Sequence, residues 1–167
     1  MTAYRTSLIL YVLLPFFMGC KVSMNGYSID PEAKTFLVGN FKQEAPNAPA
    51  TISNTFQELL KDKVARQSRL KYIDRDADME FNGSIENYVV AAVAPQPNEQ
   101  TSFNRLSIYV KVDYINHLDE KDNFSKTFSH FADFPTDQNL LQVQDELIVI
   151  IFNQILEDIF NQAFNNW

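Results

Sequence analysis

Residues that commonly carry enzymatic or metal chemistry are scarce in this chain of 167 residues, which has one cysteine, two histidines and four glycines. A single cysteine, Cys20, allows no intramolecular disulfide, and the spacing of His117 and His130 is not that of a Cys/His metal site. No Gly-rich phosphate loop and no Gly-x-Ser-x-Gly nucleophile motif is present. We therefore expect no enzymatic activity, no cofactor and no bound metal.

Basic residues are also few, because 14 lysines and arginines stand against 21 acidic residues. The resulting formal net charge of −7 argues against a nucleic-acid partner, since such proteins show a basic excess. Apolar and aromatic residues, by contrast, make up 46% and 13% of the sequence. A chain of this length and composition can build one domain with a substantial core.

An apolar run of eleven residues, 8–18 (LILYVLLPFFM), follows Arg5 near the N-terminus. This length is typical of a signal peptide and is shorter than the roughly twenty residues of a spanning helix. The run ends at Gly19-Cys20, and a small residue before a cysteine is what a lipoprotein signal peptidase recognises. The alternatives are a core segment with a buried cysteine, and cleavage by the ordinary peptidase, which the absence of an Ala-x-Ala site disfavours.

We expect cleavage before Cys20 and attachment of lipid to its thiol. Residues 1–19 are then a lipoprotein signal peptide, residues 20–33 a lipid-anchored tether, and residues 34–167 a single α/β sandwich domain. Cleavage removes Arg5 and leaves 13 basic against 21 acidic residues, a net charge of −8. Lys21 replaces the aspartate of the familiar inner-membrane retention signal, which favours a lipid anchor at the periplasmic side of the outer membrane.

Five segments of the mature chain have the composition or alternation of strands: 35–41, 70–73, 79–94, 106–114 and 124–134. Apolar residues at helical spacing predict a helix at 52–70, and a long one from residue 140 onwards that Thr136 or Asp137 would cap. This order indicates an α+β fold, a two-layer sandwich of two helices packed on one face of a four-stranded mixed, mostly antiparallel sheet. The second half of 79–94 is apolar on both faces, which predicts coverage on both sides or contact with a partner.

Two groups of charged residues are candidates for ligand binding. Asp74, Asp76 and Asp78 alternate, but the segment lacks the glycine and the terminal glutamate of a calcium loop, so we interpret it as a solvated turn. Five basic residues are suited to charge-assisted hydrogen bonds with an anion such as a lipid phosphate: Arg66, Arg69, Lys71, Arg105 and Lys111.

Five segments carry a family resemblance: 31–36 (PEAKTF), 74–85 (DRDADMEFNGSI), 104–112 (NRLSIYVKV), 123–134 (NFSKTFSHFADF) and 157–167 (EDIFNQAFNNW). In order and spacing they resemble the LptE family of lipopolysaccharide-assembly lipoproteins, in its Bacteroidetes form. The resemblance implies helices on a four-stranded sheet, no enzymatic activity, and a plug inside the outer-membrane β-barrel LptD. It also implies help with assembly of that barrel and with delivery of lipopolysaccharide to the cell surface.

The resemblance assigns no ligand-binding residue, so the five basic residues above are the candidate lipopolysaccharide contacts. A rival hypothesis is a free-standing, periplasmic-facing lipoprotein that binds a small ligand or a lipid in a pocket between helix and sheet. It predicts a closed apolar cavity and no barrel partner, whereas a plug predicts apolar side chains on the surface. A hydrolase is disfavoured because no nucleophile–base pair is visible.

Overall fold

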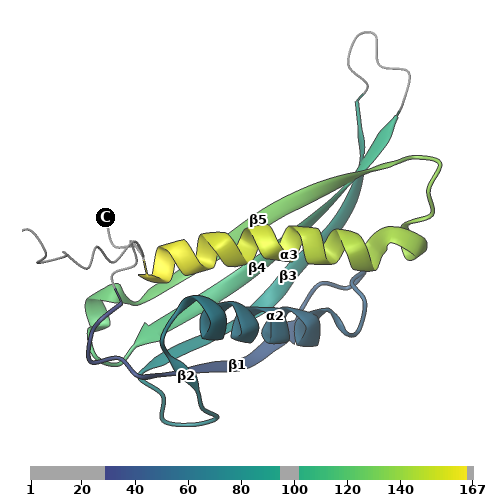
Figure 1. Ribbon diagram of the computed structural model, residues 1–167. Helices are drawn as coiled ribbons and strands as arrows, with labels where there is room; N and C mark the ends of the chain where they lie inside the picture. The colour runs from purple at the N-terminus through teal and green to yellow at the C-terminus, as the bar shows by residue number, and fades with distance from the viewer. Residues whose placement is uncertain (1–28, 95–101, 165–167) are drawn as a thin grey trace, which may run out of the picture.

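The computed structural model describes residues 29–94 and 102–164. Figure 1 shows two helices lying on the same face of one twisted sheet, with strand order β2-β1-β3-β4-β5. The elements are β1 (Thr35–Gln43), α2 (Ile52–Gln67), β2 (Lys71–Tyr72), β3 (Met79–Val93), β4 (Phe103–Asn116), the 3-10 helix η2 (Glu120–Asp122), β5 (Phe124–Pro135) and α3 (Leu140–Phe164). The predicted α+β class, with two helices on a mixed sheet, is confirmed.

The expectation of a four-stranded sheet is wrong, because the sheet has five strands. The strand β2 contains two residues and pairs in parallel with β1, which places Lys71 opposite Thr35 and Tyr72 opposite Phe36. A strand is predicted at 70–73, but two paired residues are too few for a periodic signal that would place this strand in the sheet. It exists because the chain returns beside β1 after α2, where the Lys71 N–H donates to the Lys34 carbonyl at 2.9 Å.

The rest of the sheet matches the predicted mixture of pairings. The strand β1 runs parallel to β3, whereas β3, β4 and β5 are antiparallel neighbours. Along β4 the residues alternate between buried and partly exposed, so that Leu106, Ile108 and Val110 all face the helices with no exposed surface. This alternation is what a sheet covered on one face requires.

Aromatic side chains fill the space between the helices and the sheet. Phe56 of α2 lies between Phe41 of β1 and Phe152 of α3, with ring centroids 4.9 and 5.0 Å apart. All three side chains are essentially buried. Tilted and edge-on contacts at these distances stabilise the packing beyond the burial of apolar area.

The helix α3 is long and apolar enough to span a membrane by length and composition alone. Half of its most apolar stretch is nevertheless buried inside the protein, where Ile151, Phe152, Ile155 and Ile159 have no exposed surface. Its opposite side carries exposed Glu157 and Asp158. This distribution is that of the core helix of a folded domain.

The predicted cap of α3 is wrong by a few residues. The Asn139 side-chain oxygen accepts the Leu141 N–H at 3.0 Å, whereas the Thr136 hydroxyl donates to the Ser102 carbonyl. Because β5 continues to Pro135, Thr136 belongs to the strand end and not to the helix start. The helix α2 ends at Gln67, three residues earlier than expected, where Ser68 is extended and its N–H donates to Val64.

The interpretation of Asp78 as part of a solvated turn is also wrong. One oxygen of its carboxylate accepts hydrogen bonds from the backbone N–H groups of Lys34 and Thr35, both at 2.9 Å, and from the Thr35 hydroxyl at 2.8 Å. The Asp78 N–H donates back to that hydroxyl oxygen at 3.0 Å. The Lys34 hydrogen bond, followed by that of the Thr35 hydroxyl, holds the pKa of Asp78 below its ordinary value. Asp78 therefore ties the start of β3 to the start of β1.

Replacing this carboxylate with an amide, as Asp78→Asn, should lower the free energy of unfolding by about 1–3 kcal/mol at neutral pH. A carboxyl whose pKa is lowered on folding contributes stability above its unfolded pKa of about 3.9, and this is lost as pH falls through the folded pKa. The difference between the two proteins should therefore shrink in acid. Urea unfolding at about pH 7 and about pH 3 measures it. The control is Asp74→Asn, on the same turn, and an equal loss there would contradict this role for Asp78.

Candidate functional site

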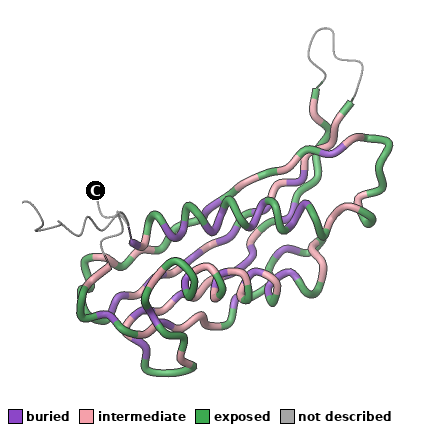
Figure 2. Tube along the Cα trace, in the orientation of Figure 1, coloured by how far each residue is buried: buried purple, intermediate pink, exposed green. Residues whose placement is uncertain are grey.

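Figure 1 shows one end of the sheet at which β3, β4 and β5 run past β1. Apolar side chains on this end of the sheet are exposed. The last residue of β1, Gln43, is opposite Ile85, so β3 beyond that point has no β1 partner. Val89 and Val90 follow, with 47% and 41% of their surface exposed although they point to opposite faces of the strand. In Figure 2 the residues at this end of β3 are coloured mostly as exposed or intermediate. In the segment predicted to be apolar on both faces, Tyr88 is buried, whereas Val89 and Val90 beyond it are largely exposed.

Strand register brings further apolar side chains together on the face of the sheet that carries no helix. Ser107 of β4 is opposite Val89 of β3 on one side and Phe131 of β5 on the other. Tyr109, two residues further along β4, projects from the same face. Phe131 is 51% exposed and Tyr109 37% exposed. We call Val89, Tyr109 and Phe131 the outer patch.

Arg105 lies beside the outer patch. Its guanidinium donates two hydrogen bonds to the Asp133 carboxylate, at 2.7 and 2.9 Å, and lies 3.6 Å from the centre of the Phe131 ring. The bond from Arg105 holds the pKa of Asp133 below its ordinary value, and the same bond raises the pKa of Arg105. Arg105 therefore orients Phe131 and balances the charge at the edge of the patch.

Lys111 projects from the same face of β4 as Arg105 but lies six residues further along the strand. At about 3.4 Å per residue the two positions are roughly 20 Å apart, which is too far for one phosphate. The Lys111 ammonium lies 4.0 Å from an oxygen of Asp113. The structure therefore does not unite these two candidate contacts.

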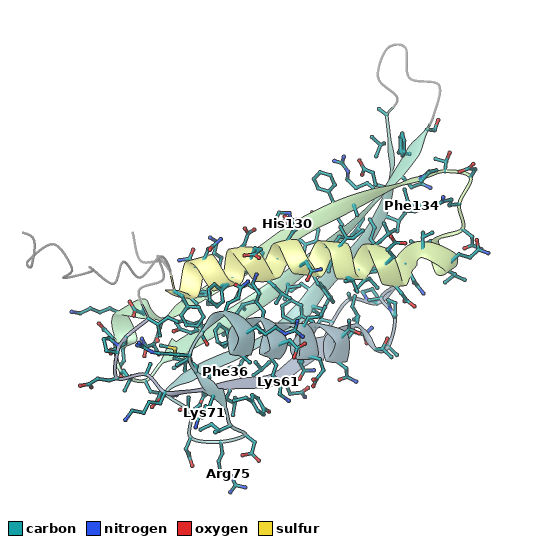
Figure 3. All side chains as sticks on the ribbon, in the orientation of Figure 1. Phe36, Lys61, Lys71, Arg75, His130 and Phe134 are labelled. Carbon is teal, nitrogen blue, oxygen red and sulfur yellow. The ribbon has the colours of Figure 1, made fainter. Side chains whose placement is uncertain are left out.

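Arg69 and Lys71 do come together, at the opposite side of the molecule. They line a surface depression of about 540 Å³, and Lys34 contributes a third cation to it. Sequence reasoning missed Lys34, since only the parallel pairing of β1 with β2 places it next to Lys71. Figure 3 shows Lys71 near the β2 edge of the sheet, where its side chain is exposed.

The fifth basic candidate, Arg66, belongs to neither group. Its guanidinium pairs with Asp62 one turn earlier on α2, at 2.7 Å, and both side chains are largely exposed. Arg66 also lines a separate groove of about 260 Å³ between α2 and α3, together with Lys63. Lys63 in turn forms an ion pair with Glu157 of α3. The five candidates therefore occupy separate places, and only Arg69 and Lys71 share a depression.

The remaining candidates do not form a reactive site. The Nε2 atom of His117 lies 3.2 Å from Glu80, and that of His130 lies 2.7 Å from Asp158 of α3. These pairs are partly exposed and join neighbouring elements. No group of three or more potential metal ligands occurs within the described ranges. Cys20, the predicted lipid attachment site, lies outside the described residues.

A family model described as LptE, lipopolysaccharide-assembly, matches residues 33–163 and so includes all five strands. The chain belongs to the LptE family. The family resemblance found in the sequence is thereby confirmed. LptE proteins are non-enzymatic lipopolysaccharide-assembly lipoproteins of the cell envelope.

Several solved structures are similar to this chain at low sequence identity, whereas no curated protein matches the sequence. A hypothetical protein from Chlamydia trachomatis, 9% identical, gives a TM-score of 0.53 over 80% of this chain and 100% of its own. The uncharacterised lipoprotein B from Nitrosomonas europaea, 8% identical, gives 0.49 over 78% and 82%. A minor lipoprotein from Acinetobacter baumannii, 14% identical, gives 0.47 over 77% and 91%. The first likeness supports the two-layer fold and nothing further.

Proposed function

We propose that this LptE-family protein is an outer-membrane lipoprotein, anchored through lipid on Cys20 at the periplasmic side, that plugs the β-barrel LptD and helps to assemble it. In this role it assists delivery of lipopolysaccharide to the cell surface. The family assignment supports the link to lipopolysaccharide assembly. The proposal adds the barrel partner, the plugging position and the anchor.

The observation that carries the barrel partner is the outer patch together with the exposed end of β3. Val89, Val90 and Phe131 expose apolar surface at one end of the sheet. Apolar residues that are exposed together mark surfaces that bind another molecule. Aromatic side chains are enriched at the centres of protein interfaces, and Arg105 adds a polar partner at the rim. The end of the sheet beyond β1 is therefore the surface that we assign to the barrel.

The rival function, binding of a small ligand between helix and sheet, needs an apolar cavity there. Phe41, Phe56 and Phe152 instead fill that interface with ring contacts of about 5 Å. The depression beside Lys71 and the groove between α2 and α3 are open to solvent. A third depression, lined by residues of β5 and α3 that include Phe128 and Asp158, is open as well. The packing of the described residues therefore favours a protein partner.

Purification of the tagged full-length chain from detergent-solubilised outer membrane tests the proposal. A large partner whose migration changes on heating is expected to co-purify, since this behaviour is typical of a folded barrel. The double variant Val89→Asp/Phe131→Asp should reduce the amount of partner at least tenfold, because buried charge at an interface centre is costly. The mass of the purified chain reports directly on lipid at Cys20.

The matched control is Val89→Ile/Phe131→Tyr, which keeps the same positions apolar or aromatic and should retain the partner. Circular dichroism of both variants checks that the domain is folded. If the native chain leaves the membrane only as a free monomer, the barrel partner is excluded. If the two double variants retain the partner equally, the barrel contacts a different surface.

A further inference from the structure

The depression lined by Lys34, Arg69 and Lys71 has no acidic residue in its lining, which is completed by Pro31, Ala33 and Thr35. This is unusual in a protein whose acidic residues outnumber its basic ones by 21 to 14. All three cationic residues are exposed to solvent. The nearby Asp78 carboxylate is held by the backbone of β1, and Asp30 accepts the Glu32 N–H at 2.8 Å.

The three cations are held in place by different parts of the fold. The N–H of Lys71 donates to the carbonyl of Lys34, so the two lysines leave neighbouring points of the parallel β1–β2 pair. Arg69 precedes β2, and its Nη2 atom donates to the carbonyls of Ile29 and Asp30, at 3.2 and 2.9 Å. Within the described residues these bonds leave the Nε and Nη1 side of the guanidinium for another acceptor.

The same two bonds locate the depression relative to the predicted anchor. Arg69 binds Ile29 and Asp30, the first described residues of the chain, so the described domain begins beside the three cations. Eight residues lie between Cys20 and Ile29, and the nine extended steps that join these two residues span at most about 30 Å. The cations therefore lie within tether length of the lipid.

We propose that Lys34, Arg69 and Lys71 bind the phosphate headgroup of an anionic phospholipid in the membrane that holds the anchor. A guanidinium binds phosphate through a planar pair of hydrogen bonds, and two ammonium groups add point charges. The tether alone would leave the domain free to rotate, and the acidic remainder of the surface is repelled by anionic lipid. A headgroup site at the tether entry would give the domain one preferred orientation on the membrane. The inference rests on the lipid anchor proposed above and is independent of the barrel.

Vesicle flotation of the chain that begins at Lys21 tests this, because that chain keeps every helix and strand of the described ranges. At low ionic strength the chain should bind vesicles of phosphatidylcholine with phosphatidylglycerol and should not bind phosphatidylcholine alone. The variant Lys34→Gln/Arg69→Gln/Lys71→Gln should lower the partition coefficient about fivefold per residue. The control Lys111→Gln/Lys121→Gln/Lys126→Gln removes the same charge elsewhere and should leave binding within about twofold.

Two results would overturn the headgroup site. The first is a failure of the chain to bind anionic vesicles. The second is an equal loss of binding in the control variant, which would show that binding depends on total charge and not on these three residues. Micelles of purified lipopolysaccharide form the second arm: if only micelle binding depends on the three cations, the phosphate belongs to lipopolysaccharide and not to phospholipid. The double variant Lys34→Gln/Lys71→Gln keeps the Arg69 bonds to the tether and should still lose most of the vesicle binding. Co-purification of the barrel should be unchanged in it, which separates this inference from the proposed partner.

Discussion

Adding one methyl group at Gly83 should destabilise the domain by about 3 kcal/mol or more. A Cβ atom at this position would lie 2.0 Å from the Lys111 carbonyl oxygen, 3.0 Å from its carbonyl carbon and 2.8 Å from the Phe41 ring. The carbonyl belongs to the backbone of β4, which is paired along its length with β3 and β5. Relief of the clash would therefore require separation of strands. Urea unfolding of Gly83→Ala followed by circular dichroism measures the loss.

Gly39 provides a matched control on the neighbouring strand. A Cβ there would also approach another atom to 2.0 Å, but that atom is the side-chain oxygen of Asn82. Because the Asn82 side chain can rotate away, Gly39→Ala should cost no more than about 1 kcal/mol. The expected order is decisive: if Gly39→Ala were as damaging as Gly83→Ala, the close approach of β3 and β4 would not explain the glycine.

Truncation of Phe152 to alanine should lower the free energy of unfolding by about 3–5 kcal/mol. This side chain has no exposed surface and packs edge-on against Phe56, so its removal leaves a cavity where α2, α3 and the sheet meet. The loss is large for a domain whose total stability is of the order of 5–15 kcal/mol. Thermal and urea unfolding should show the same destabilisation.

Ile150→Ala is the control for Phe152→Ala because it shortens an apolar residue on the same helix. Ile150 is 46% exposed, so its loss should change stability by at most about 1 kcal/mol. The pair also tests the role of α3. If Phe152→Ala and Ile150→Ala were equally stable in water, the buried face of α3 would not be part of the core of the domain. The membrane-like composition of α3 would then need another explanation.

The site was only partly accessible from the sequence. The composition of residues 79–94 correctly indicated a strand segment apolar on both faces. Successive residues of a strand point to opposite faces, so a short run of consecutive apolar residues is enough to show this. The neighbours of that segment depend on register. Val89 meets Phe131 across Ser107 only because β3, β4 and β5 pair as they do, and a shift of one residue would send Phe131 to the opposite face.

The basic candidates illustrate the same limit. Arg69 and Lys71 are two residues apart, so their proximity follows from the chain itself. Lys34 joins them because the chain crosses over through α2 and returns parallel to β1, an arrangement set by packing of that helix on the sheet. Lys111 and Arg105 share a strand face, yet six residues of extended chain keep them apart.

Asp78 shows how tertiary contact changes the role of a residue. By itself, the alternation of Asp74, Asp76 and Asp78 is that of an exposed turn. The parallel approach of β1 places two backbone N–H groups and one hydroxyl against Asp78, and the carboxylate accepts all three bonds. The sequence contains the carboxylate but no sign of its partners, which lie more than forty residues earlier.

The sequence alone determined the class of elements, the helix–strand order, the family resemblance and the prediction of a lipid anchor, because each depends on short-range patterns of apolar, polar and special residues. Only the tertiary structure decided the place of the fifth strand beside β1, the outer patch and the cluster of Lys34 with Arg69 and Lys71. Those features depend on strand register and on the crossover through α2. Both are fixed when the apolar faces of α2 and α3 pack on one side of the sheet. This burial of apolar surface stabilises the folded domain, and it arises only when segments distant in the sequence meet.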